Sequence, residues 1–126
     1  MKLARFSYKG SVPAWGVVDL EHQEINPIKE RFEDWAPLVT AGAGISAVSF
    51  SSGPLAIKEV TLLPPIEPVN RVVVAGANYL KHLKDDFSLE PPKQPIAFLK
   101  AYGALIGADD PIRFPPLTEE LDYEVE

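Results

Sequence analysis

The stretch Arg71-Val72-Val73-Val74-Ala75-Gly76 decides the fold of the second half of the chain. Its run of β-branched residues predicts a buried strand. Asn78 follows and can cap a short helix that extends to Asp86. A second strand, over residues 96–100, comes after a proline-rich loop. We therefore expect a strand, a short helix and a further strand. Several candidate functional residues of this half of the chain lie on these three elements or close to them.

The segment 64–68 reads Pro-Pro-Ile-Glu-Pro and is the clearest break in the sequence. Proline fixes φ and disfavours helix, so this segment predicts a stiff connector. We place a domain boundary here. The boundary separates an N-terminal domain of residues 1–66 from a second domain of residues 67–126.

The first half of the chain predicts a small domain of strands and one helix. Residues 3–8 and 14–20 are short, apolar-rich and β-prone, which predicts a hairpin. Residues 29–41 predict a helix that Pro37 must kink or divide, because proline lacks an N–H and clashes with the preceding turn. Residues 45–63 hold two further β-prone runs. The apolar face of the helix would consist of Phe32, Trp35, Leu38 and Val39.

The composition narrows the class of protein. With 46% apolar residues the chain can bury a core, and its formal net charge of −6 argues against nucleic acid and anionic membranes as partners. The chain has no cysteine, which excludes disulfides and thiolate metal sites. Its first residues do not form a signal peptide, and no stretch approaches the roughly 20 apolar residues of a membrane span. We therefore expect a cytoplasmic protein.

The last six residues alternate apolar and acidic side chains, which predicts a strand. On such a strand Asp122, Glu124 and Glu126 would line one face. Neighbouring carboxylates repel one another unless water or a cation separates them, and they suit a hard ion such as Mg²⁺, Mn²⁺ or Ca²⁺. The pattern therefore predicts part of a divalent-metal site. The alternative is an edge strand whose acidic face is solvated.

The helix expected after Asn78 carries a second group that could do chemistry. His82 and Asp85 are three residues apart and would be neighbours on its surface. A carboxylate beside an imidazole orients the ring and raises its basicity, which suits a general base acting on water. Asp86 is the other candidate partner, and the alternative is a surface histidine with a casual acidic neighbour. Lys100, at the end of an apolar strand, either binds a substrate carboxylate or caps the strand in solvent.

The order of these features resembles the fumarylacetoacetate hydrolase family. A Val-Val-Val-Ala-Gly strand runs into Asn78-Tyr79-x-x-His82, a Phe-x-Lys strand ends at Lys100, and Asp-Tyr-Glu-Val-Glu follows. The similarity covers most of the chain, and residues 72–126 carry its specific part. The resemblance implies an α+β, β-rich fold, in which a small N-terminal β/α domain precedes the first part of a mixed β-roll.

The resemblance also implies a metal site. Family members hold Mg²⁺ or Mn²⁺ with the two glutamates of a Glu-x-Glu element and an aspartate further on. Glu124 and Glu126 match those glutamates. Asp122 matches a common residue of the motif that is not normally a ligand.

For catalysis, His82 matches the family's base, Asp85 occupies the position of its acidic partner, and Lys100 with Tyr79 would contact the substrate. Substrates in the family are mostly small 2,4-dioxo (acylpyruvate-like) acids or enol acids. The resemblance implies a hydrolase in which the metal binds the 2-oxo acid, activated water attacks the distant ketone, and a carbon–carbon bond breaks. An isomerase, decarboxylase or lyase of the same family, and a non-catalytic structural module, are the alternatives.

Three positions depart from the family pattern. Ala77 replaces a larger or basic residue, which puts substrate selectivity in question. Ala101-Tyr102 replaces a stretch with proline and serine. The third metal ligand would lie beyond Glu126. We therefore expect that the chain alone is incomplete and inactive. It would belong to a longer enzyme, homodimeric at full length, or a companion chain would complete its fold.

Overall fold

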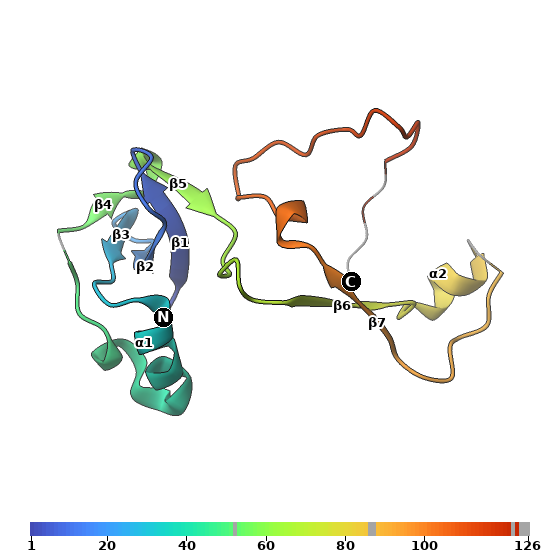
Figure 1. Ribbon diagram of the computed structural model, residues 1–126, viewed down its shortest axis with the longest axis horizontal. Helices are drawn as coiled ribbons and strands as arrows, with labels where there is room; N and C mark the ends of the chain where they lie inside the picture. Colours follow the sequence, from blue (N-terminus) through green and yellow to red (C-terminus); the bar gives the residue numbers. More distant parts are fainter. Residues whose placement is uncertain (52, 86–87, 122, 124–126) are drawn as a thin grey trace. The chain divides into compact units, whose positions relative to one another are not determined.

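The computed structural model of the chain describes residues 1–51, 53–85, 88–121 and 123. Its strand-rich α+β class agrees with the expected fold (Figure 1). The chain forms two compact units. Unit 1 consists of Met1–Glu67 and the later segment Ile106–Pro111, and unit 2 consists of Pro68–Leu105 and Ile112–Glu126. Unit 1 is therefore built from two separate stretches of sequence.

Unit 1 is built on a five-stranded antiparallel sheet in the order β4-β3-β2-β1-β5. Its strands are β1 (Leu3–Tyr8), β2 (Ala14–Asp19), β3 (Glu24–Pro27), β4 (Leu55–Ala56) and β5 (Val60–Leu63), with a short 3-10 helix η3 (Ile57–Glu59) before β5. β1 and β2 form the hairpin that the sequence predicts. In its turn the N–H of Ser11 donates to the Tyr8 carbonyl at 2.9 Å, and Gly10 supplies a φ of 75°.

An aromatic cluster packed between the sheet and helix α1 (Phe32–Leu38) forms the core of unit 1. Trp15 comes from β2, while Phe32 and Trp35 come from α1. The Trp15 ring centroid lies 5.0 Å from that of Phe32 and 5.9 Å from that of Trp35. Such offset and edge-on ring pairs add to the stability gained by burying the rings. The cluster therefore fixes α1 against the sheet.

Helix α1 is shorter than the predicted helix 29–41. Pro37 lies in its last turn and does not begin a second helix; a π-helical turn η1 (Val39–Ala43) and a 3-10 helix η2 (Gly44–Ala47) follow. The wider turn comes directly after the proline, which has no N–H for the Glu33 carbonyl. Leu38 is 51% exposed, so its predicted place on the buried face is wrong.

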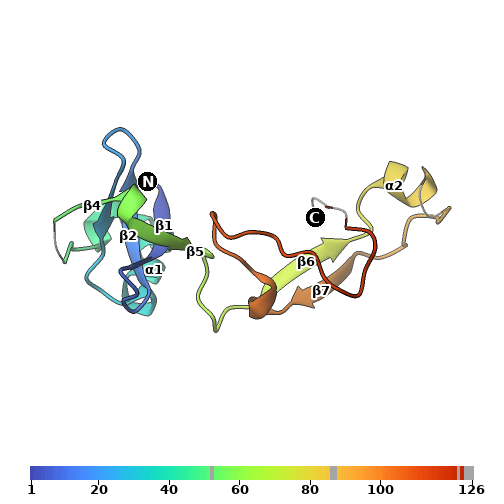
Figure 2. The ribbon, with the colours of Figure 1, turned by 90° about the horizontal axis from the view of Figure 1, so that it is seen from above.

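Unit 2 contains an antiparallel two-stranded ribbon of β6 (Val72–Gly76) and β7 (Ile96–Lys100), which lie side by side in Figure 2. Helix α2 (Leu80–Asp85) follows β6, and the 3-10 helix η4 (Tyr102–Ala104) follows β7. The pairing runs from Val72 opposite Lys100 at one end to Gly76 opposite Ile96 at the other. We call the Val72–Lys100 end the base of the ribbon.

The ribbon is more exposed than the sequence predicts. The strand predicted over residues 71–76 forms as β6, but its predicted burial is wrong, because Val73 and its partner Leu99 are each 64% exposed. Within the described residues β6 pairs with β7 alone, and all five residues of β7 are exposed. As for a membrane, none of the helices in the described part of the chain has the length and apolar character that a crossing needs.

Candidate functional site

Helix α2 is positioned by the end of β6. Ala77, the residue after the strand, has a φ of 57°, in the left-handed region that non-glycine residues seldom adopt. The N–H of Leu83 donates to the Tyr79 carbonyl at 3.0 Å, and the Leu83 side chain is 5% exposed. A strained backbone position that is retained next to polar side chains is a feature that functional sites share. Burial of Leu83 fixes the orientation of α2, in which His82 is the residue directly before Leu83.

His82 and Asp85 lie three residues apart on α2, as predicted, and His82 is partly buried. Residues at this spacing are neighbours on a helix surface. The Asp85 carboxylate also lies 3.9 Å from the ammonium group of Lys81, and both of these side chains are exposed. The ion-pair partner of the Asp85 carboxylate is thus Lys81, in an exposed pair of a kind that contributes little to stability. Asp86, the other candidate partner, lies outside the described residues.

Lys100 lies at the base of the ribbon, whereas α2 begins beyond its other end. Its ammonium group is 5.5 Å from the centroid of the Phe98 ring, a cation–π contact at an exposed position. Four residue steps separate Lys100 from Ile96, which is about 13 Å along a strand. The structure thus places His82 and Asp85 on α2, Tyr79 directly before its first residue, and Lys100 at the opposite end of the ribbon.

The predicted metal ligands Glu124 and Glu126, together with Asp122, lie outside the described residues. Leu121 and Tyr123, the described members of the predicted strand, are not part of a strand. In residues 1–51, 53–85, 88–121 and 123, no three His, Asp or Glu side chains form a group that could hold a metal ion. The metal site therefore stays a prediction from the sequence.

A pocket of about 310 Å³ lies beside the start of α2. The turn from Gly76 to Asn78 and Leu80 form one side, and the loop 91–96 forms the other. Asn78, Lys93 and Gln94 supply its polar groups among prolines and aliphatic side chains. The sequence analysis did not assign Lys93 or Gln94 a role, although the proline-rich loop between two site motifs was a signal that they lie close to the site.

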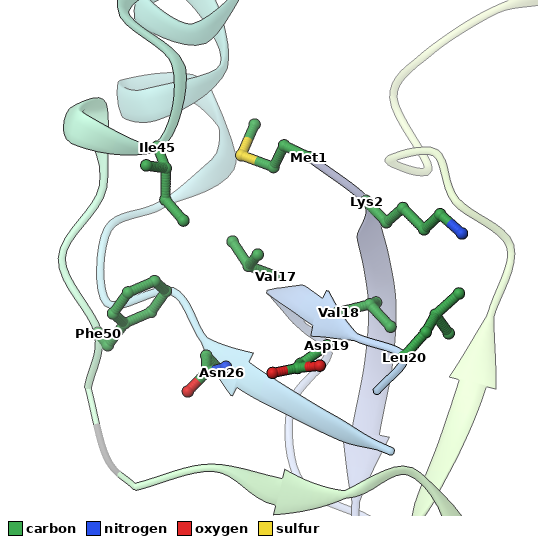
Figure 3. Close-up of a pocket in the computed structure, with 9 residues that line it drawn as sticks. All are labelled: Met1, Lys2, Val17, Val18, Asp19, Leu20, Asn26, Ile45 and Phe50. Carbon is green, nitrogen blue, oxygen red and sulfur yellow. The ribbon is translucent and has the colours of Figure 1, made fainter. Parts of the chain in front are cut away.

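A larger pocket of about 540 Å³ lies on unit 1 (Figure 3). In Figure 3, Val17, Ile45 and Phe50 face a common space, with Asp19 at its edge. Large apolar pockets are the usual first candidates for a binding site. The lining here is mainly aliphatic and aromatic, and its one carboxylate is already bonded within a turn. This pocket is therefore a poor candidate for acid–base chemistry.

That carboxylate, Asp19, accepts hydrogen bonds from the backbone N–H groups of Glu21 and His22 at 2.9 and 3.1 Å. Its other oxygen lies 2.7 Å from Nδ1 of His22. The hydrogen bond to Asp19, together with its negative charge, raises the pKa of the His22 imidazole. The same bond, with the backbone bond from His22, lowers the pKa of Asp19. The pair closes the β2–β3 turn.

Two family descriptions match the chain. Residues 71–126 match the family described as fumarylacetoacetate (FAA) hydrolase, C-terminal. Residues 1–65 match the family described as Rv2993c-like, N-terminal. The two matches meet near the proline-rich connector and cover nearly the whole chain.

Similar proteins include vertebrate oxaloacetate tautomerases. The human mitochondrial oxaloacetate tautomerase FAHD2A is 40% identical over 68 residues, which cover 54% of this chain and 21% of that protein. The Xenopus laevis mitochondrial oxaloacetate tautomerase fahd2 is 33% identical over 81 residues, which cover 64% of this chain and 25% of that protein. The matched part of this chain thus spans about a quarter or less of these relatives.

A solved structure also resembles the chain. An uncharacterized protein from Mycobacterium abscessus superposes with a TM-score of 0.59 at 26% identity. The superposition covers 93% of this chain and 40% of that protein. Nearly all of the present chain therefore follows the fold of a part of that larger protein.

Proposed function

The chain belongs to the fumarylacetoacetate hydrolase family, and from that premise we propose that it forms part of an enzyme that interconverts the keto and enol forms of a small 2-oxo acid of the oxaloacetate class. The observation that carries the proposal is the similarity to two vertebrate oxaloacetate tautomerases. The polar groups of α2 support it, because tautomerisation needs groups that move protons.

Tautomerisation removes a proton from carbon 3 of the acid and places a proton on the oxygen at carbon 2. The electron pair of the broken C–H bond becomes the new C2=C3 double bond, and negative charge collects on that oxygen until a proton arrives. His82 is the proposed proton acceptor, because an imidazole titrates near neutral pH. Asp85 would stabilise the protonated ring whenever its carboxylate is turned from Lys81 to His82.

Substrate binding is assigned to the two remaining side chains. Lys100 has an exposed ammonium group, which suits a substrate carboxylate, and Phe98 supports it from one side. Tyr79 is 52% exposed one turn before Leu83 and offers a hydroxyl group.

A divalent metal belongs to the proposal as well. Glu124 and Glu126 are the proposed protein ligands, and Mg²⁺ or Mn²⁺ fits their carboxylate oxygens best. When bound, such an ion supplies Lewis-acid stabilisation for the oxygen at carbon 2.

Cleavage of a carbon–carbon bond in a 2,4-dioxo acid is the second candidate. The spacing of His82 and Asp85 favours it, because an imidazole with a carboxylate neighbour can activate water as well as accept a proton from carbon. Both reactions act on a substrate that carries a 2-oxo acid group. In tautomerisation His82 would remove a proton from carbon 3, whereas in cleavage it would remove a proton from water.

The test compares the two histidines of the chain in the whole protein. Loss of enol absorbance with oxaloacetate reports tautomerisation, and loss of an acylpyruvate reports cleavage. His82→Gln should lower the rate by about 10²–10⁴-fold, the usual contribution of a general base. His22→Gln, in the β2–β3 turn of unit 1, is the matched control and should retain the rate. A His82→Gln protein as active as the control would refute the role of His82, and turnover of the acylpyruvate alone would favour the second candidate.

A further inference from the structure

The pocket of about 310 Å³ beside the start of α2 has a lining that suits an anion. Lys93 is the one cationic side chain among its described lining residues, and none of these residues is an Asp or a Glu. Asn78 and Gln94 add side-chain amides, each of which carries two N–H donors. The described lining therefore holds a positive charge and several hydrogen-bond donors, with no carboxylate that competes for them.

The loop that presents Lys93 is stiffened by prolines on both sides. Pro91 and Pro92 precede Lys93, and Pro95 follows Gln94. Proline fixes its own φ and restricts the residue before it to extended conformations. The prolines have no backbone N–H, so the donors on this side of the pocket are concentrated at Lys93 and Gln94. A stiff loop also loses little conformational entropy when a ligand binds.

The ammonium group of Lys93 has no acidic partner in the part of the chain that the structure describes. No Asp or Glu of that part forms an ion pair with Lys93, whereas Lys81 lies 3.9 Å from Asp85. An exposed lysine is by itself an ordinary feature of a protein surface. What sets Lys93 apart is its place beside two amide groups in a pocket whose described lining has no acid.

The register of the ribbon places this pocket at the end where α2 begins. Gly76 is paired with Ile96, and both residues line the pocket (Figure 2). Leu80 lines it as well and is the first residue of α2, and His82 follows two residues later. Two residue steps span at most about 7 Å between Cα atoms. The pocket therefore lies close to the backbone position of the proposed base.

We propose that this pocket binds the substrate carboxylate that is attached to carbon 3, with Lys93 as the cation and Asn78 and Gln94 as hydrogen-bond donors. The inference rests on the proposed function, since it assumes an acid of the oxaloacetate class. In such an acid the carbon that loses the proton is bonded directly to this carboxylate. Holding the carboxylate therefore holds the reacting carbon beside α2, and Lys93 selects 2-oxo acids with a second carboxylate over those without one.

The test uses the whole protein and two unreactive four-carbon acids, succinate with two carboxylates and butyrate with one. Lys93→Gln removes the charge, and Lys84→Gln is the matched control, because Lys84 is an exposed lysine of α2 that does not line the pocket. Calorimetry should give a succinate Kd about tenfold or more higher in Lys93→Gln, as expected for the loss of a hydrogen bond to a charged group, and an unchanged Kd in Lys84→Gln. Lys93→Arg keeps the cation and should retain most of the affinity.

Turnover of oxaloacetate gives a second measurement. Lys93→Gln should raise KM by about tenfold and leave kcat nearly unchanged, because the proposed base is still present. No detectable binding of succinate to the unaltered protein, equal Kd values for Lys93→Gln and Lys84→Gln, or equal losses for succinate and butyrate would overturn the proposal. A selective loss of succinate binding without any turnover of oxaloacetate would support the carboxylate site and refute the proposed reaction instead.

Discussion

His22 and Asp19 illustrate how a two-residue contact links charge to folding. Their hydrogen bond raises the pKa of the imidazole and lowers that of the carboxyl group. A raised pKa means that the folded chain binds the His22 proton more tightly than the unfolded chain does. The resulting gain in the free energy of unfolding is fully present below the ordinary histidine pKa of about 6.5, and it is lost as the pH rises through the raised pKa. The lowered pKa of Asp19 also stabilises the folded chain, and this contribution is lost as the pH falls through the pKa of Asp19 in the folded state.

Asp19→Asn should therefore lower the pKa of His22 towards its ordinary value. An NMR titration of the imidazole protons measures this directly. Glu24→Gln is the control, because Glu24 is the smallest of the influences that raise the His22 pKa and its removal should have less effect. An unchanged His22 pKa in Asp19→Asn would contradict the contact.

The candidate site shows what residue spacing can and cannot predict. The spacing of His82 and Asp85 correctly predicts that they are neighbours on a helix. It does not predict that Lys81 lies 3.9 Å from the same carboxylate, because the choice of partner depends on side-chain rotamers on an exposed surface. Whether these residues carry catalysis stays a prediction.

At the scale of single elements, α1 offers the sharpest test of the core. Trp35 is 2% exposed and contacts two aromatic rings, while Leu38, in the same helix, is 51% exposed. Trp35→Ala should lower the free energy of unfolding by about 3–5 kcal/mol, through lost burial and the cavity left behind. Leu38→Ala should cost less than about 1 kcal/mol. Urea unfolding followed by circular dichroism compares the two, and equal losses would contradict the packing of α1.

The same helix shows why apolar periodicity alone misplaced one residue. The residues of this segment that pack in the core are Phe32, Trp35, Ala36 and Val39, at the spacing i, i+3, i+4 and i+7 of a regular helix. Leu38 lies six residues after Phe32 and falls beside this face, so it is exposed. An apolar residue was therefore assigned to the core for its hydrophobicity, although the small Ala36 holds the place in the helical period.

At the scale of the whole molecule, exposed apolar surface sets how the chain behaves in solution. The paired residues Val73 and Leu99 are each 64% exposed on one face of the ribbon. Exposed apolar patches promote association. We expect the chain to self-associate and to bind a hydrophobic dye. Val73→Thr combined with Leu99→Thr should reduce both, and sedimentation velocity measures the first.

Leu117→Thr is the matched control for that pair, because Leu117 is 99% exposed and lies outside the ribbon. It should change association much less. Equal effects of the control and the double variant would show that total apolar surface, and not the ribbon face, drives association.

Contacts between residues far apart in the chain were the hardest feature of the fold to predict from the sequence. The hairpin, the connector and the strand–helix–strand order follow from local patterns of apolar residues, proline and glycine. The inclusion of Ile106–Pro111 in unit 1 does not, because it depends on a backbone contact between Gly107 and Leu62, far apart in sequence. Nothing in the local sequence distinguishes a glycine required by a distant strand from one in an ordinary turn.

The split composition of unit 1 has a consequence for biosynthesis. Synthesis at about 5–20 residues per second needs roughly 2–9 seconds to extend the chain from Glu67 to Pro111. During that interval all five strands of the sheet have been synthesised, while the turn that covers Leu62 has yet to be made. The outer edge of β5 is then free to pair with other nascent chains made on the same messenger RNA, which neighbouring ribosomes bring close to it.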